Sequence, residues 1–212
     1  MFLREFEDTL RPTITGTRGM VASAHPLATG AGVRILAEGG NAFDAAVAVA
    51  AVLNVVEPYM SGIAGVGYAN VYSARDDCIK VLDYVGKTPD NATLDAFSSP
   101  EEKDHGIRSC LVPGACGGWL ALLERYGTMD REQVFQPAIA LAENGFALTA
   151  KNESFISGSI NALDDRAKTK FLFEGQPLRQ GMILKQPELA NALRMVVAQG
   201  ADAFYRGSWH PR

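Results

Sequence analysis

One run of small apolar residues constrains the fold of this chain more than any other feature. Residues 39–58 read GGNAFDAAVAVAAVLNVVEP, and only Asp44 and Asn54 interrupt the apolar stretch. We expect Asn41 to cap a helix, with Asp44 in its first turn, where the helix dipole favours an acid. Pro58 ends that helix near residue 56. Because a helix that is apolar on all sides is buried on all sides, we expect it to lie between a sheet and another layer.

The flanking segments predict the elements around this helix. Residues 20–24 favour a short strand, and a first helix begins at Pro26 and ends at the glycine pair 39–40. Two β-rich runs, 66–74 and 78–86, flank a polar turn and predict a hairpin. Helical patterns follow near 114–126, 131–145, 149–163 and 187–199. This order predicts an α+β fold or a layered sandwich rather than a series of βαβ units.

Composition excludes several classes of function. A net charge of −4 argues against a nucleic-acid partner. The longest apolar run, residues 45–53, is shorter than the roughly 20 residues of a membrane span. The first ten residues, MFLREFEDTL, contain no apolar signal core, which predicts a cytoplasmic protein. The three cysteines, Cys78, Cys110 and Cys116, form no CxxC pair and are expected to be reduced thiols.

No motif assembles a catalytic constellation by itself. The sequence GIAGVG (62–67) reverses the dinucleotide fingerprint and precedes a strand, so we interpret it as a structural turn. His25, His105 and His210 lie far apart without metal-ligand spacing, and His25 suits a turn or a helix cap. No metal and no cofactor are therefore expected.

The remaining reactive side chains favour structural roles. Cys110 and Cys116 flank a helix start, where a thiol pKa can fall, but a buried structural cysteine is the favoured interpretation. The paired carboxylates Glu101–Glu102 and Asp164–Asp165 lie in polar stretches and are expected to be solvated.

Longer stretches show a resemblance to a known family. They are GTRGMVASAHPLATGAGVRILAEGGNAFDAAVAVAAVLNVVEPYMSGIAGVGY, VLDYVGKTP, VPGACGGWLALLERYG, QPAIALAENGF and FYRG. Together they resemble the opening of the gamma-glutamyltranspeptidase family over nearly the whole chain from Gly16. The resemblance implies a partial αββα sandwich of the N-terminal-nucleophile hydrolase type, rich in helix. It implies an N-terminal arm over residues 1–18, and over 19–212 an incomplete domain, the N-terminal portion of a large chain.

The resemblance also implies a reaction. Family members are self-cleaving precursors whose new N-terminal Thr attacks an amide, such as a gamma-glutamyl compound of glutathione metabolism. That Thr leads a small chain that pairs with the large one. We therefore expect no catalytic residue in this chain and expect a missing C-terminal small chain as its partner.

The sequence departs from the family at the expected substrate contact. The family carries an Arg soon after the LD of the second hairpin strand, where it binds an α-carboxylate. Here that position is Val85, and Lys87 either supplies a weaker point charge or is a solvated lysine. Ala64 and Val66 also interrupt a turn that is richer in glycine elsewhere in the family. An acylase of different acyl specificity, and a non-catalytic truncated remnant or pairing subunit, both stay open.

Overall fold

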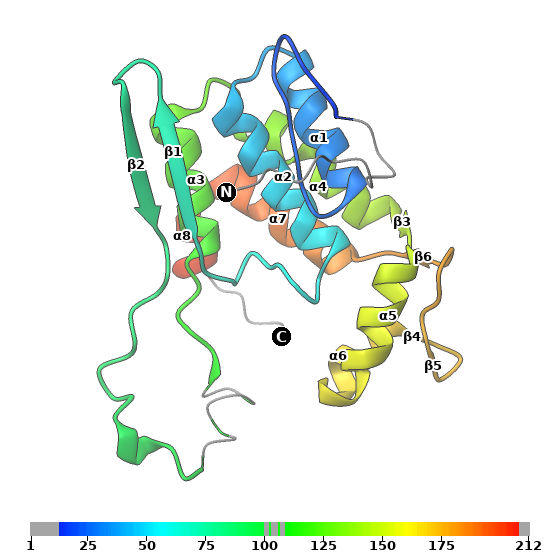
Figure 1. Cartoon of the computed structure of the whole chain (residues 1–212). Coiled ribbons are helices and arrows are strands. Elements are labelled where there is room, and N and C mark those ends of the chain that lie inside the picture. The colour runs from blue at the N-terminus through cyan, green and yellow to red at the C-terminus, as the bar shows by residue number, and fades with distance from the viewer. Residues whose placement is uncertain (1–12, 100–101, 103–105, 107–108, 208–212) are drawn as a thin grey trace, which may run out of the picture.

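Helices dominate the computed structural model, which describes residues 13–99, 102, 106 and 109–207 (Figure 1). The α-helices are α1 (Pro26–Ala37), α2 (Ala42–Val56), α3 (Ala115–Tyr126), α4 (Arg131–Asn144), α5 (Ala150–Ser159), α6 (Asp165–Phe171), α7 (Pro187–Gln199) and α8 (Ala201–Tyr205). The 3-10 turns η1 (Leu94–Ala96) and η4 (Ile160–Ala162) accompany them.

The described strands pair in twos. β1 (Tyr68–Ser73) and β2 (Cys78–Asp83) form an antiparallel hairpin in which Tyr68 lies opposite Asp83. This confirms the predicted hairpin, with shorter strands. The other pairs are β3 (Phe146–Ala147) with β6 (Ile183–Leu184) and β4 (Leu172–Phe173) with β5 (Gln176–Pro177).

The α2 helix begins as its sequence predicts. The Asn41 side chain accepts hydrogen bonds from the backbone N–H groups of Phe43 and Asp44, at 2.8 and 3.1 Å. The Asp44 carboxylate accepts one in return from the Asn41 N–H, at 2.9 Å. This reciprocal capping satisfies donors that a helix start leaves free. The helix then packs against α1, α3 and α4, while α4 also packs against α7.

A close approach brings α1 against α2 at Gly32. A Cβ atom at this position would lie 2.7 Å from a methyl group of Val49 and 2.8 Å from one of Val21. Only glycine leaves room for such a contact. Small residues on these two helices therefore set how near they lie.

Two predictions about the surroundings of α2 are wrong. Helices α1, α3 and α4 cover it rather than a sheet on one side, and Ala42 and Ala46 are exposed. Apolar periodicity predicts burial but does not specify what provides it. Residues 20–24 form no strand, because none of the described strands pairs with them.

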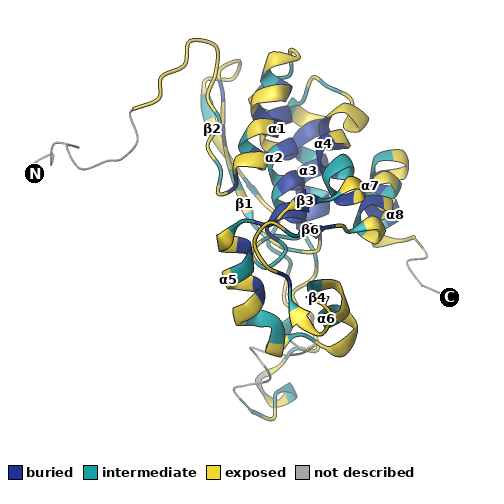
Figure 2. Cartoon of the chain, turned by 90° about the vertical axis from the view of Figure 1, so that its right-hand side faces the viewer, coloured by how far each residue is buried: buried dark blue, intermediate teal, exposed yellow. Residues whose placement is uncertain are grey.

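Burial is uneven across the molecule. Figure 2 shows buried residues concentrated in α2, α3, α4 and α7, whereas α5 and α6 are largely exposed. In α5 only Asn152 and Ile156 are buried. None of the helices in the described ranges has the length and apolarity needed to cross a bilayer.

Candidate functional site

The segment that leaves β2 contains the residues expected to contact substrate. The N–H of Tyr84 donates to the carbonyl oxygen of Gly67 at 3.0 Å, which extends the hairpin by one step. The N–H of Val85 donates to the carboxylate of Asp83 at 2.9 Å. Val85 is half-buried, whereas Lys87 is exposed and makes no ion pair with the part of the chain that the structure describes. The backbone is therefore held up to Val85, and the Lys87 ammonium faces solvent.

Three glycines form a slot for Tyr84, just before this segment. A Cβ atom at Gly118 would lie 2.4 Å from the Tyr84 ring, and one at Gly67 would lie 2.9 Å from it. At Gly114 it would lie 1.8 Å from the Tyr84 carbonyl oxygen. Burial in this slot raises the pKa of the Tyr84 phenol. Tyr84 thus anchors the β2 exit on the first turns of α3.

The chain that leaves β2 returns beside it before α3. A Cβ atom at Gly86 would lie 2.2 Å from the carbonyl oxygen of Val112. The start and the end of the connection between β2 and α3 are therefore in contact. The contact between the two ends of this connection was not predicted from the sequence, although Gly86 and the glycines of α3 could have indicated a close approach of the backbone.

The glycine-rich turn 62–67 caps α3. The Gly65 carbonyl oxygen accepts from the N–H groups of Gly114 and Ala115, at 2.9 and 2.8 Å. The Ile63 carbonyl oxygen accepts from Cys116 at 3.2 Å, and the Tyr205 hydroxyl oxygen accepts from Gly117 at 3.0 Å. Because these donors are already satisfied, the turn has the structural role that was predicted.

All three cysteines are free thiols, as predicted. Cys116 is buried at the start of α3, and burial raises the pKa of its thiol to about 11. A thiol with so high a pKa is a poor nucleophile near neutral pH. Cys110 is exposed and Cys78 is half-buried.

His25 is the one histidine within the described residues. His25 caps α1, where its Nδ1 accepts from the Leu27 N–H at 3.2 Å, which confirms the predicted cap. His105 and His210 lie outside the described residues. Within the described ranges, no group of three or more His, Cys, Asp or Glu residues could hold a metal ion.

The paired carboxylates have local roles. Asp164 caps α6 by accepting from the Ala167 N–H at 2.7 Å, and Asp165 is exposed beside Lys168. The Glu102 carboxylate accepts from the Ser98 N–H at 3.1 Å, while Glu101 lies outside the described residues.

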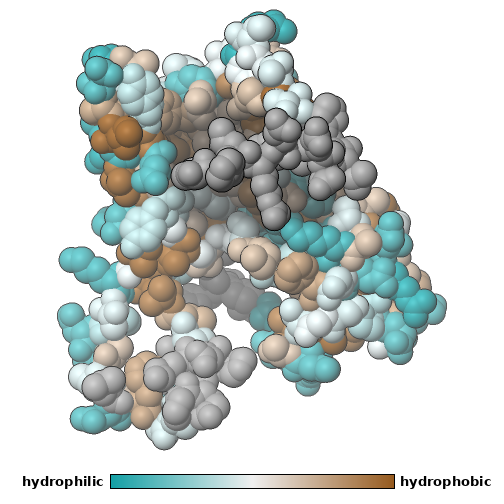
Figure 3. All heavy atoms as spheres, in the orientation of Figure 1, coloured by the Kyte–Doolittle hydropathy of each residue, from teal (hydrophilic) through white to brown (hydrophobic). Residues whose placement is uncertain are grey.

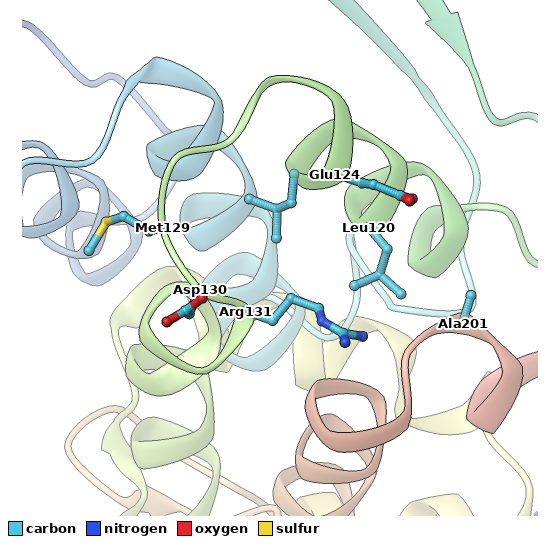
Figure 4. Close-up of a pocket in the computed structure, with 7 residues that line it drawn as sticks. Leu120, Glu124, Met129, Asp130, Arg131 and Ala201 are labelled. Atoms are coloured by element: carbon cyan, nitrogen blue, oxygen red, sulfur yellow. The ribbon is translucent and has the colours of Figure 1, made fainter.

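A surface groove of about 410 Å³ lies between α3, α4 and α8 (Figure 4). Its lining is Leu120, Leu123, Glu124, Met129, Asp130, Arg131 and Ala201. In the close-up the Arg131 guanidinium extends between Leu120 and Ala201. This lining includes no hydroxyl, thiol or imidazole; its ionisable side chains are those of Glu124, Asp130 and Arg131.

Known proteins resemble this chain along most of its length. A sequence model described as gamma-glutamyltranspeptidase matches residues 28–209. The acylase ACY 1 proenzyme of Pseudomonas sp. (strain V22) is 40% identical over 91% of this chain, which spans 37% of that relative. The glutathione hydrolase proenzyme of Bacillus subtilis (strain 168) is 37% identical over 95% of this chain, which spans 36% of it. The crystal structure of Helicobacter pylori gamma-glutamyltranspeptidase superposes with a TM-score of 0.87 at 33% identity, covering 93% of this chain and 59% of that one.

Proposed function

This chain belongs to the gamma-glutamyltranspeptidase family, and we propose that it is part of the large chain of an amidohydrolase or acyltransferase. Its fold is the helix-rich part of an N-terminal-nucleophile hydrolase. The whole enzyme attacks an amide with a Thr hydroxyl, releases the amine and forms an acyl-enzyme ester. Water or a second amine then takes the acyl group. The chain spans about a third of two relatives that are named proenzymes, which supports a Thr supplied by a segment outside these residues.

The outer face of the hairpin supports such a partner segment. Side chains alternate along each strand, and four large ones point away from the helices and are more than half exposed. They are Tyr68, Tyr72, Ile79 and Val81. In Figure 3, hydrophobic surface appears over the hairpin, at the left of the molecule. A contiguous exposed apolar surface commonly marks an interface. We propose that the segment with the nucleophile covers this face.

The proposed acyl specificity depends on Val85, which stands where the family has an Arg. A valine cannot bind a carboxylate, and the exposed Lys87 offers only a mobile point charge. The substrate is thus either a gamma-glutamyl compound held weakly by Lys87 or an acyl compound that lacks the α-carboxylate. The 40% identity to a protein named acylase favours the second class, and the 37% identity to one named glutathione hydrolase favours the first.

One experiment separates these classes and the non-catalytic alternative. The protein carrying any Thr-led segment encoded with it is assayed on gamma-glutamyl-p-nitroanilide and on 4-aminobutyryl-p-nitroanilide, which lacks only the α-carboxylate. A higher kcat/KM for the 4-aminobutyryl compound supports the acylase, and a lower one supports the transpeptidase. If a cooperatively folded protein hydrolyses neither anilide, the result supports the non-catalytic alternative, a pairing subunit or a truncated remnant. These 212 residues alone are expected to be inactive. The cytoplasmic location remains a prediction, which cell fractionation tests.

A further inference from the structure

The ring of Tyr84 lies between two segments that are far from it in the sequence. Tyr84 directly follows β2, which runs alongside α3 (Figure 1). A Cβ atom at Gly67, just before β1, would lie 2.9 Å from a ring carbon of Tyr84 and 3.1 Å from its hydroxyl oxygen. A Cβ atom at Gly118 in α3 would overlap the same ring. The ring therefore has backbone close on two sides, at α3 and at the start of the hairpin.

The main chain of Tyr84 is fixed as closely as its ring. Its N–H donates to the Gly67 carbonyl oxygen at 3.0 Å. A Cβ atom at Gly114, just before α3, would overlap the Tyr84 carbonyl oxygen, so only glycine permits this contact. Gly114 is itself held, because its N–H donates to the Gly65 carbonyl oxygen at 2.9 Å. The position of Tyr84 relative to α3 is thus set by its peptide groups as well as by its ring.

These contacts hold the backbone on both sides of position 85. The N–H of Val85 donates to the Asp83 carboxylate at 2.9 Å. The next residue, Gly86, approaches the backbone of Val112 so closely that a Cβ atom would overlap its carbonyl oxygen. Because successive side chains of an extended chain alternate, the side chain at position 85 is directed away from the side on which the Tyr84 ring packs. The placement of that side chain therefore follows from the placement of Tyr84.

We propose that Tyr84 is a positioning residue for acyl selectivity: its packing between Gly67 and Gly118 fixes where the side chain at position 85 meets the substrate. This inference rests on the proposed function, in which position 85 lies at the acyl group. Tyr84 acts through the backbone rather than by contact with the substrate. A misplacement of about 1 Å at a substrate contact can cost about 100-fold in rate, so a small shift of the β2 exit is enough to change selectivity.

Double variants of the protein that carries its Thr-led segment test this role. Val85→Arg is expected to raise the ratio of kcat/KM for gamma-glutamyl over 4-aminobutyryl anilide by roughly 10- to 100-fold. Tyr84→Leu fills part of the slot but cannot span it from Gly118 to Gly67. In the Val85→Arg background it should reduce that gain to less than about threefold. Tyr84→Phe keeps the ring and should retain the gain within about twofold.

The ratio separates positioning from stability. Loss of folded protein lowers kcat/KM for both anilides alike, so a purely structural role of Tyr84 leaves their ratio unchanged. Gly118→Ala displaces the ring by its added methyl group and should also reduce the gain of Val85→Arg. Its matched control is Gly30→Ala, whose added methyl group has no atom within 4 Å and should leave the gain intact. A gain that survives in full in Tyr84→Leu would overturn the proposal.

Amide hydrogen exchange distinguishes failure of this inference from failure of the proposed function. In Tyr84→Leu, protection of the amides at positions 84 and 85 should fall by about tenfold relative to Tyr84→Phe, while the amides of α4 keep theirs. Equal protection in the two variants would overturn the inference whether or not the protein is active. If protection falls as expected but Val85→Arg gives no gain, the acyl assignment of the proposed function is wrong, and the role of Tyr84 in selectivity is overturned with it.

Discussion

The carboxylate of Asp44, in the first turn of α2, accepts hydrogen bonds from Thr128, 84 residues further along the chain. The Thr128 hydroxyl donates at 2.7 Å and its backbone N–H at 3.0 Å. The Met129 N–H adds a longer bond of 3.3 Å. One fully buried carboxylate therefore caps α2 and holds the connection between α3 and α4.

Replacing Asp44 should strongly destabilise the chain. Asp44→Ala removes the buried carboxylate that accepts from the N–H groups of Asn41 and Thr128, and hydrogen bonds to charged groups are the strong ones. We expect a loss of about 2–4 kcal/mol in the free energy of unfolding, measured by urea denaturation. The exposed Asp165→Ala is the control and should change stability by less than about 0.5 kcal/mol. Comparable losses for both would contradict the role of Asp44.

Replacing two helical glycines by alanine should have opposite effects, because Gly118 lies in the Tyr84 slot and Gly30 does not. Gly118→Ala places a methyl group 2.4 Å from the Tyr84 ring and should cost about 1–3 kcal/mol through overpacking. Gly30→Ala in α1 has no atom within 4 Å of the added methyl and should stabilise by about 0.4–1 kcal/mol. Thermal or urea unfolding of the two variants measures both changes. Stabilisation by Gly118→Ala would show that Tyr84 moves aside freely.

Val85→Arg should shift acyl preference towards gamma-glutamyl compounds. A guanidinium at this position adds a charge-assisted contact to the α-carboxylate. We expect the ratio of kcat/KM for gamma-glutamyl over 4-aminobutyryl anilide to rise by roughly 10- to 100-fold in the active protein. Arg75→Gln, at the opposite end of the hairpin, should leave the ratio unchanged. An unchanged ratio in Val85→Arg would show that the α-carboxylate of the acyl group does not bind near residue 85.

Lys87 is tested by the same ratio. If its ammonium holds the α-carboxylate, Lys87→Gln lowers the ratio by about two- to tenfold, and Lys87→Arg restores it. An effect of Lys87→Gln on both anilides alike would indicate a general rather than a substrate-specific role.

The three thiols should differ in reactivity. With a pKa of about 11, Cys116 exists as thiolate in only about one molecule in a thousand at pH 8, and it is buried as well. Alkylation of the native protein, followed by mass spectrometry, should label Cys110 first and Cys116 only after unfolding. Equal labelling of Cys110 and Cys116 in the native state would show that the start of α3 opens readily.

Local chemistry allowed much of this fold to be predicted. Asn41 and Asp44 lie next to the helix that they cap, so its start could be recognised without knowledge of any other segment. The hairpin was predictable for the same reason, because its polar turn and its two β-rich runs are contiguous. His25 as a helix cap likewise depends on a residue two positions away.

The wrong predictions concern what lies beside an element. Residues 20–24 have strand composition, but a strand needs a neighbouring strand, and composition does not specify one. The apolar α2 was expected against a sheet, and instead three helices pack on it. Apolar periodicity reports that a face prefers burial, and many partners satisfy that preference equally well.

The sequence by itself determined the family and the helix caps, because these depend on residue type and short spacing. Only the tertiary structure decided that Gly65 caps α3, that Tyr84 lies against Gly118, and that Asp44 holds Thr128. Each of these contacts joins segments far apart in the chain. Such contacts depend on the relative placement of whole elements, which core packing sets and local sequence does not encode.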